Sequence, residues 1–275
     1  VARVLSCGAI FIQGGDAAEV TLEDVTMSYN TAAPYASGWG GALAVVNTPH
    51  FKLSGSDLGH CTISTNVAGA AGNGLGGGIF LQGIADAEVS SCRFFNNYAS
   101  GGSAAEPPAP ATSGLGGGLF VEESFGIIVD GNKFDFNVAQ TATPQFNRAG
   151  SGGGMFVANS SMATIGNNLF DRNTAGFSGT GFGGGAAVIK GDGYVGAITG
   201  TIVYSNTFTQ NWATVINFIG AAGGGLYAYG IDDSQVTGNT FTANAANTMG
   251  EGGMQMTPIP YGGGLGLRHI YHAQV

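Results

Sequence analysis

The sequence predicts an all-β solenoid, in which short parallel strands stack coil upon coil. Three observations lead to this fold class: a composition rich in glycine and poor in charge, a short motif written seven times, and clusters of glycine between the motifs. The 275 residues include 51 glycines but only 8 basic and 17 acidic residues. Glycine at this density disfavours helix, because each glycine costs a helix about 1 kcal/mol relative to alanine. With 44% of the chain hydrophobic, a buried core can still form.

The repeated motif places an apolar residue three positions before an asparagine and five before an alanine. In stacked coils a repeated position forms a column, with a rise of about 4.8 Å per coil. We expect the apolar column inside, the asparagine column at a corner where its amides bond to neighbouring coils, and the alanine in a tight inward turn. The apolar column is Met27, Ile63, Phe94, Phe134, Phe170, Phe208 and Phe241, and the asparagine column is Asn30, Asn66, Asn97, Asn137, Asn173, Asn211 and Asn244.

Clusters of glycine mark a second fixed point in each repeat. The distance from the last glycine to the motif asparagine is 19 residues in four repeats, as from Gly78 to Asn97, so this half of the repeat is a rigid template. The other half varies in length, and we expect its extra residues, 100–110, 141–151 and 247–260, to emerge as loops on one side. The clusters are Gly40-Gly41 and residues 76–78, 116–118, 152–154, 183–185, 223–225 and 262–264, with Cys7-Gly8 in the equivalent place at the start.

A single repeat is too short to bury its own apolar face and must stack on its neighbours, as in a solenoid or a propeller. Propeller blades need hairpin turns, and the Asn-Gly and Asp-Gly signals for them are few, so the solenoid is favoured. We expect one domain over residues 1–275 with about seven coils. The chain begins without Met shortly before a glycine cluster and stops just after another. We therefore expect a fragment of a longer chain or an open-ended fibre subunit.

A second column lies five positions before each motif asparagine. Two members from consecutive coils are Cys61 and Cys92, whose Cα atoms would lie about 5 Å apart in a stack, within the range that a disulfide accepts. We expect this bond in an oxidising compartment and two reduced, buried thiols in a reducing one. Cys7 has no counterpart. The column is Val25, Cys61, Cys92, Asn132, Asn168, Asn206 and Asn239, so its later coils form a second asparagine ladder.

An aromatic column follows the glycine clusters by two residues. Its flanking positions, such as Leu119 and Val121, are aliphatic and suit a crowded interior, so strand alternation turns the aromatic column outward. Three interpretations of such a row of rings stay open: the long loops cover it, it contacts another protein chain laterally, or sugar rings stack on it. The column is Ile10, Leu43, Phe80, Phe120, Phe156, Ala187, Tyr227 and Gly266, and the interface would consist of Phe80, Phe120, Phe156 and Tyr227.

The two markers together resemble a known group. A glycine cluster followed by aliphatic and aromatic residues, as in Gly116-Gly117-Gly118-Leu119-Phe120, is paired with Phe134-Asp135-Phe136-Asn137. This pairing resembles the repeats of chlamydial polymorphic outer-membrane proteins and related right-handed β-helix surface proteins, over essentially the whole chain. The resemblance implies a pectate-lyase-like, right-handed parallel β-helix that is secreted or displayed on a surface, often in adhesion. Such motifs specify a fold better than a function, since the same solenoid carries lyases, hydrolases, adhesins and fibre subunits.

The charged residues do not predict a catalytic site. Polysaccharide lyases and hydrolases on a solenoid need several carboxylates, with a basic residue or Ca²⁺, on one exposed sheet. Here the acidic residues are scattered. Asp135 and Asp171 share one column, with Lys133 and Arg172 nearby, and we expect them to be a solvated surface pair. His269 and His272 would point to opposite faces of an extended strand, so no metal site is predicted, and no cofactor site either.

Charge and hydropathy limit the partners. A net charge of −9 without a basic cluster disfavours nucleic acid. The longest uncharged stretch, residues 212–230, is interrupted by glycines, so no transmembrane segment is expected. Asn159-Ser160-Ser161 is a sequon for Asn-linked glycosylation in a secreted protein. The expected partners are other protein chains, among them copies of this chain end to end or laterally, and surface carbohydrate.

The sequence therefore predicts a non-catalytic, extracellular or cell-surface protein with a structural or adhesive role, in which the solenoid is a surface module or a fibre subunit. The alternatives are a carbohydrate-active enzyme and a carbohydrate-binding solenoid. An enzyme requires a groove lined by carboxylates, whereas an adhesive module does not.

Overall fold

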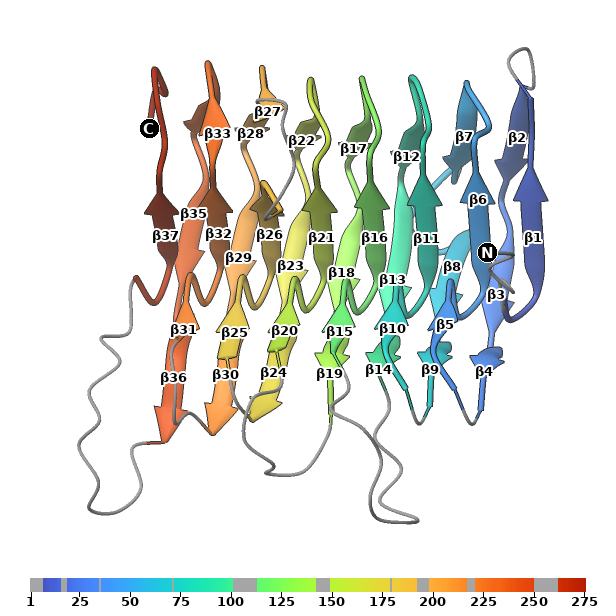
Figure 1. The fold of residues 1–275 in the computed structure, drawn as a ribbon, viewed down its shortest axis with the longest axis horizontal. Coiled ribbons are helices and arrows are strands. Elements are labelled where there is room, and N and C mark those ends of the chain that lie inside the picture. Colours follow the sequence, from blue (N-terminus) through green and yellow to red (C-terminus); the bar gives the residue numbers. More distant parts are fainter. Residues whose placement is uncertain are drawn as a thin grey trace.

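The chain folds into a solenoid of parallel strands in the computed structural model, with successive coils side by side along the long axis (Figure 1). The structure describes residues 7–15, 19–34, 36–70, 72–100, 113–141, 149–178, 180–191, 198–216, 221–249 and 262–275. These residues contain strands and turns but no helix. Each full coil contributes one strand to each of five sheets, and every strand pairing in the described part is parallel.

Sheets 1 to 3 enclose the main core. Sheet 1 consists of β1 (Ile10–Gln13), β6 (Leu43–Val46), β11 (Ile79–Gln82), β16 (Leu119–Glu122), β21 (Met155–Ala158), β26 (Ala186–Ile189), β32 (Leu226–Tyr229) and β37 (Leu265–Arg268). Sheet 2 consists of β2 (Val20–Glu23), β7 (Phe51–Ser54), β12 (Glu88–Ser90), β17 (Ile128–Asp130), β22 (Thr164–Gly166), β28 (Ile202–Tyr204) and β34 (Gln235–Thr237). Sheet 3 consists of β3 (Thr26–Ser28), β8 (Cys61–Ser64), β13 (Cys92–Phe95), β18 (Lys133–Asp135), β23 (Leu169–Asp171), β29 (Thr207–Thr209) and β35 (Thr240–Thr242).

Sheets 4 and 5 extend each coil at the other end of the cross-section (Figure 1). Sheet 4 consists of β4 (Thr31–Ala33), β9 (Val67–Gly69), β14 (Tyr98–Ser100), β19 (Val138–Gln140), β24 (Thr174–Ser178), β30 (Trp212–Ile216) and β36 (Ala245–Met249). Sheet 5 consists of β5 (Gly38–Trp39), β10 (Gly74–Leu75), β15 (Gly114–Leu115), β20 (Ala149–Ser151), β25 (Thr180–Phe182) and β31 (Ala221–Ala222). A short pair, β27 (Ile198–Thr199) with β33 (Ile231–Asp232), completes the described strands.

The predicted loop insertions fall largely outside the described residues. Where the structure describes them, these segments are partly strand rather than loop: in the first two, 100–110 and 141–151, Ser100 ends β14 and residues 149–151 form β20, so the prediction was wrong there. In the third, 247–260, residues 247–249 belong to β36 of sheet 4, and the remainder lies outside the described residues.

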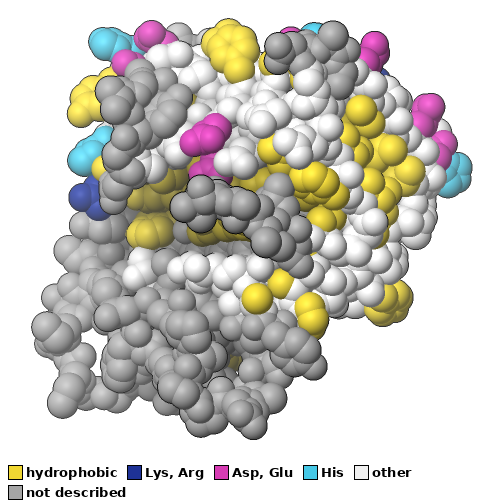
Figure 2. Space-filling model, turned by 45° about the vertical axis from the view of Figure 1, so that its right-hand side comes forward, with side chains coloured by type: hydrophobic (Ala, Val, Ile, Leu, Met, Phe, Trp, Pro, Cys, Tyr) yellow, Lys and Arg dark blue, Asp and Glu magenta, His cyan; other side chains and the backbone are white. Residues whose placement is uncertain are grey.

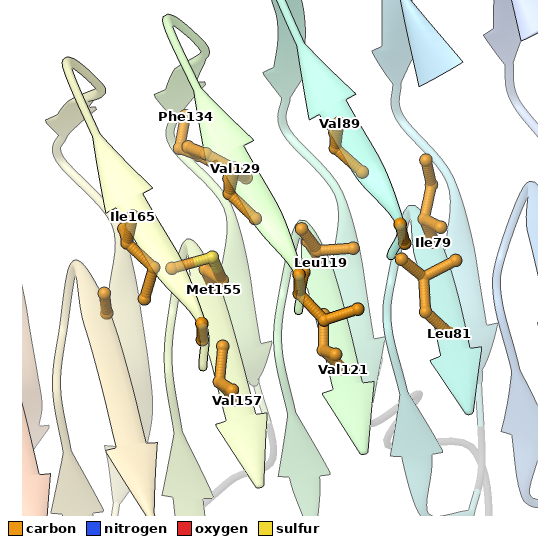
Figure 3. Close-up of a cluster of buried hydrophobic side chains, with 14 of the residues drawn as sticks. Ile79, Leu81, Val89, Leu119, Val121, Val129, Phe134, Met155, Val157 and Ile165 are labelled. Atoms are coloured by element: carbon orange, nitrogen blue, oxygen red, sulfur yellow. The ribbon is translucent and has the colours of Figure 1, made fainter. Parts of the chain in front are cut away.

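The motif phenylalanines stack inside the solenoid as predicted. Their rings are parallel, with centroids 4.8 Å apart from Phe134 to Phe170 and again from Phe170 to Phe208. Aliphatic columns of sheets 1 and 2, including Leu119, Val129 and Met155, fill the rest of the core (Figure 3). Burial of each ring contributes about 2 kcal/mol, so this interior stabilises the stacking of coils rather than any single coil.

The motif asparagines form a continuous hydrogen-bonded ladder at the corner between sheets 3 and 4. The Nδ2 of Asn137 donates to the Oδ1 of Asn173 at 3.0 Å and to the carbonyl of Phe94 at 2.9 Å. Its Oδ1 accepts from the backbone and side-chain nitrogens of Asn97. The residue just before each ladder asparagine has a left-handed φ, as in Phe136 (54°) and Arg172 (53°). The ladder thus fixes a corner that non-glycine residues rarely form.

The three positions of a glycine triplet are constrained for different reasons. Gly116 has a φ of +64°, which favours glycine. A Cβ on Gly117 would lie 2.1 Å from the carbonyl oxygen of Gly153 in the next coil, so no side chain fits there. At Gly118 a Cβ would lie 3.1 Å from the ring of Phe134 and 2.7 Å from the carbonyl oxygen of Gly154. The triplet therefore allows adjacent coils to approach closely beside the core.

The register of the first two coils differs from the prediction by one residue. Phe11 and Ala44, not Ile10 and Leu43, pair into the column of Phe80. The reason is Ala42, which occupies the third position of the triplet in its coil and donates its backbone amide to the carbonyl of Gly78, although the run of glycines itself ends at Gly41.

Candidate functional site

The outer face of sheet 3 carries the main group of charged side chains. Because the motif phenylalanine points inward, the residues on either side of it point outward and form two surface columns. The first column is Thr26, Thr62, Arg93, Lys133, Leu169, Thr207 and Thr240, and the second is Ser28, Ser64, Phe95, Asp135, Asp171, Thr209 and Thr242.

Asp135 lies at the centre of this face and is buried, with a side chain only 3% exposed. Its Oδ2 lies 3.2 Å from the Nε of Arg93 and 3.1 Å from the Nζ of Lys133. Its Oδ1 is also buried and has no hydrogen-bond partner among the described residues. The expectation of a solvated Asp135–Asp171 pair was therefore wrong for Asp135. Long cationic side chains from its own strand and the preceding one reach over the carboxylate and replace the water that a buried charge loses.

Two aromatic rings hold guanidinium groups on the same face. The guanidinium of Arg93 lies over the ring of Phe95 at 4.6 Å, and that of Arg172 lies over Phe136 at 5.1 Å. The two rings meet edge to face at 6.0 Å. Arg172 also donates through Nε to the Oε1 of Gln210 at 2.8 Å, and lies 3.9 Å from the Oδ2 of Asp171. These contacts restrict the rotation of both arginines.

The sequence pointed to Lys133, Asp135, Asp171 and Arg172 as a charged group but did not point to Arg93, Phe95 and Phe136 as part of it. A signal was present, because Arg93 precedes Phe94 as Lys133 precedes Phe134. Stacking the predicted columns would have placed the two cations side by side.

The arrangement is layered by charge. The cationic side chains of Arg93, Lys133 and Arg172 are 40%, 33% and 46% exposed, whereas the carboxylate of Asp135 lies beneath them. Around the bend, in sheet 2, Asp130 accepts hydrogen bonds from Asn167 and from the hydroxyl of Tyr204. Asp171, on the same face, is 21% exposed, so the three cations are the more exposed charges of sheet 3.

The predicted cysteine pair is joined in the structure. Cys61 and Cys92 face each other on β8 and β13 and form a disulfide, with Cα atoms 4.7 Å apart. Cys7 is a free thiol, and burial raises its pKa. The later members of the column, Asn132, Asn168, Asn206 and Asn239, form the second asparagine ladder, in which Asn168 donates through Nδ2 to the Oδ1 of Asn206 at 3.0 Å.

The aromatic column does not form an exposed stripe, which corrects the predicted interface. Phe80 and Phe120 are 1% exposed, and Phe156 and Tyr227 are 6% exposed. They point away from the main core, as alternation requires, but pack in a second cluster with residues of sheet 5 such as Leu75 and Leu115. The strands of sheet 5, which have two or three residues each, were not recognisable in the sequence. On the face seen in Figure 2, hydrophobic side chains gather in a band, with charged side chains scattered around it.

Near the last described strand, His272 lies beside two carboxylates. Its Nδ1 is 3.0 Å from the Oδ1 of Asp232 and 4.0 Å from that of Asp233. Hydrogen bonding to Asp232 and the charges of both carboxylates raise the pKa of His272 above its ordinary value. His269 lies apart, against the ring of Tyr229. These contacts are those of a surface ion pair.

Asn159 of the sequon lies in the turn after β21. Its Oδ1 accepts a hydrogen bond from the backbone amide of Gly191 at 2.8 Å, and the neighbouring Ser160 is buried. Glycosylation of Asn159 stays a prediction.

The fold and its ladders define the class, a parallel β-solenoid with asparagine ladders at its corners. A family model described as "Right handed beta helix region" matches residues 3–257, so the chain belongs to the right-handed β-helix family. Comparison with curated proteins and with solved structures gives no match. Among the described residues, no helix is long and apolar enough to cross a membrane.

Proposed function

We propose that the chain is a non-catalytic, extracellular β-helix module with a structural or adhesive role at a surface. The observation that carries this proposal is the state of Asp135. An acid–base catalyst exchanges a proton with its substrate and must be reachable by it. Asp135 is buried from solvent and paired with Arg93 and Lys133, so we infer that this carboxylate positions the two cations rather than exchanging a proton.

Two further observations support the extracellular part of the proposal. A disulfide between stacked coils, such as Cys61–Cys92, persists in oxidising compartments and is rare in the cytosol. The repeats also resemble those of chlamydial polymorphic outer-membrane proteins, whose setting is the cell surface. Partners of such a module are surface carbohydrate and other protein chains, among them further copies of this one, and electron microscopy of the native material tests for assembly into fibres.

A carbohydrate-active enzyme is the second candidate, and one specific observation favours it. Asp135 and Asp171 lie directly opposite each other on neighbouring strands, with basic side chains around them.

One experiment separates the two candidates. The protein is incubated with a panel of extracellular polysaccharides, with and without Ca²⁺, and both protein retention and new reducing ends are measured. We expect the polysaccharide to retain the protein and no new reducing ends to appear. Cleavage that disappears in an Asp171→Asn variant would overturn the proposal and establish an enzyme. Alkylation of protein from its native source without prior reduction tests the compartment, since a reduced Cys61 or Cys92 there would contradict an extracellular location.

A further inference from the structure

We propose that the outer face of sheet 3 binds an anionic polysaccharide, through the guanidinium groups of Arg93 and Arg172 and the ammonium of Lys133. This inference rests on the proposed function and adds its binding site and ligand class. The anionic groups are carboxylates or sulfates carried along a sugar chain.

The radial order of charges argues for an anionic ligand. Three cations, from β13, from β18 and from the turn after β23, are more exposed than the two carboxylates beside them, Asp135 and Asp171, in a protein whose net charge is −9. The buried Asp135 binds Lys133 and Arg93, and its hydrogen bond with Arg93 uses the Nε of that guanidinium rather than a terminal nitrogen. Guanidinium groups pair with carboxylate and sulfate-like anions through two parallel hydrogen bonds.

The aromatic rings argue for a prepared site rather than a sugar platform. One face of Phe95 is taken by Arg93, and one face of Phe136 is taken by Arg172. The rings therefore hold the guanidinium groups in place before a ligand arrives. A binding group that is already ordered loses less conformational entropy on binding, which strengthens affinity.

Hydroxyl groups on both sides of the charged centre argue for a sugar chain rather than an acidic polypeptide. In one direction along the axis the two outer columns consist of Ser and Thr, and the hydroxyls of Ser28 and Ser64 lie 2.7 Å apart. In the other direction they consist of Thr at four positions of β29 and β35. Hydroxyls in rows, at about 4.8 Å per coil, match a polyhydroxylated ligand lying along the solenoid axis.

The test is a binding titration with four probes: heparin as the sulfated glycan, hyaluronan as the carboxylated one, dextran as a neutral one, and polyglutamate as an anionic polypeptide. We expect heparin or hyaluronan to bind, with affinity falling as salt rises, and dextran and polyglutamate to bind at least tenfold more weakly. Equal binding of polyglutamate would overturn the glycan class, and no binding of either anionic glycan at low salt would overturn the site.

Matched variants locate the site. Arg172→Gln should weaken binding about tenfold, because it removes one charge-assisted contact from an exposed position. Arg268→Gln is the control: Arg268 also lies over an aromatic ring, that of Tyr229, but on β37, and its loss changes the net charge equally. It should leave binding unchanged. Equal losses in both variants would mean attraction to overall charge and would overturn the site.

A third variant tests positioning. Phe136→Leu keeps every charge but removes the ring beneath Arg172, and we expect about threefold weaker binding with an unchanged melting temperature, since Phe136 is exposed. Unchanged affinity would refute the role of the ring. If the Arg172 and Phe136 variants bind as the unchanged protein does, and the glycan is bound without cleavage, the site is refuted but the adhesive function is not. Cleavage of the glycan would refute the proposed function itself.

Discussion

Replacing Asn173 by alanine tests whether the asparagine ladder stabilises the stack. Asn173 is buried in the middle of the ladder, where its Nδ2 donates to the carbonyl of Phe134 at 2.8 Å and to the Oδ1 of Asn211 at 3.0 Å. Its Oδ1 accepts from the backbone nitrogen of Asn137 at 2.9 Å and from the Nδ2 of that residue at 3.0 Å. Alanine removes all four hydrogen bonds.

The magnitude follows from which groups keep a partner. The Nδ2 of Asn137 still donates to the carbonyl of Phe94, and the Oδ1 of Asn211 still accepts from the backbone of residue 173. The buried backbone amide of Asn137 loses the acceptor that Asn173 provides. An unsatisfied buried amide costs about 1–3 kcal/mol and each lost hydrogen bond about 1 kcal/mol, so we expect a loss of about 3 kcal/mol after relaxation.

Thermal unfolding followed by circular dichroism measures this loss. For a chain of this size about 3 kcal/mol lowers Tm by roughly 6–12 °C. Asn244→Ala is the matched control, because Asn244 accepts the same two bonds from Asn211 but is only partly buried, so water can replace it. We expect about 1 kcal/mol there. Equal Tm values for the two variants, or no change in either, would refute the ladder as a source of stability.

Three further predictions concern the interior, the disulfide and a surface histidine. Phe170→Ala should destabilise the fold by about 3–5 kcal/mol in urea unfolding, because the ring is fully buried between two others. Changing Cys61 and Cys92 to serine should cost about 4 kcal/mol for a sequence separation of 31, and alkylation without reduction should label one thiol, not three. NMR titration should show a pKa of His272 above 6.5, which Asp232→Asn lowers. Its ion pair stabilises the fold fully below pH 6.5 and is lost as pH rises through the raised pKa.

The repeated positions of the interior could be predicted from the sequence. The burial of side chains that point away from the main core could not. The columns of Phe170 and Asn173 follow from spacing alone, because stacked coils place equal positions together. The burial of Asp135 depends on how Arg93 reaches across from the preceding coil and how Lys133 folds over from the same strand, which spacing does not encode. The burial of Phe120 depends on two-residue strands such as β15, which are too short for any periodic pattern.

The interior ladders and the outer columns are subject to different constraints, and this difference locates function in the fold. Phe134 and Asn137 contact their equivalents in the coils on both sides, so a substitution at either removes contacts with both neighbouring coils. The outward positions beside Phe134 have no such requirement, and along sheet 3 they pass from hydroxyl to charged residues and back to hydroxyl. A buried carboxylate between two cations is costly to assemble and is not needed by the coils at either end, which stack with serine at one end and threonine at the other. The centre of sheet 3 therefore differs from its ends for a reason other than stacking, and the exposed cations of that centre are the part of it that a ligand can reach.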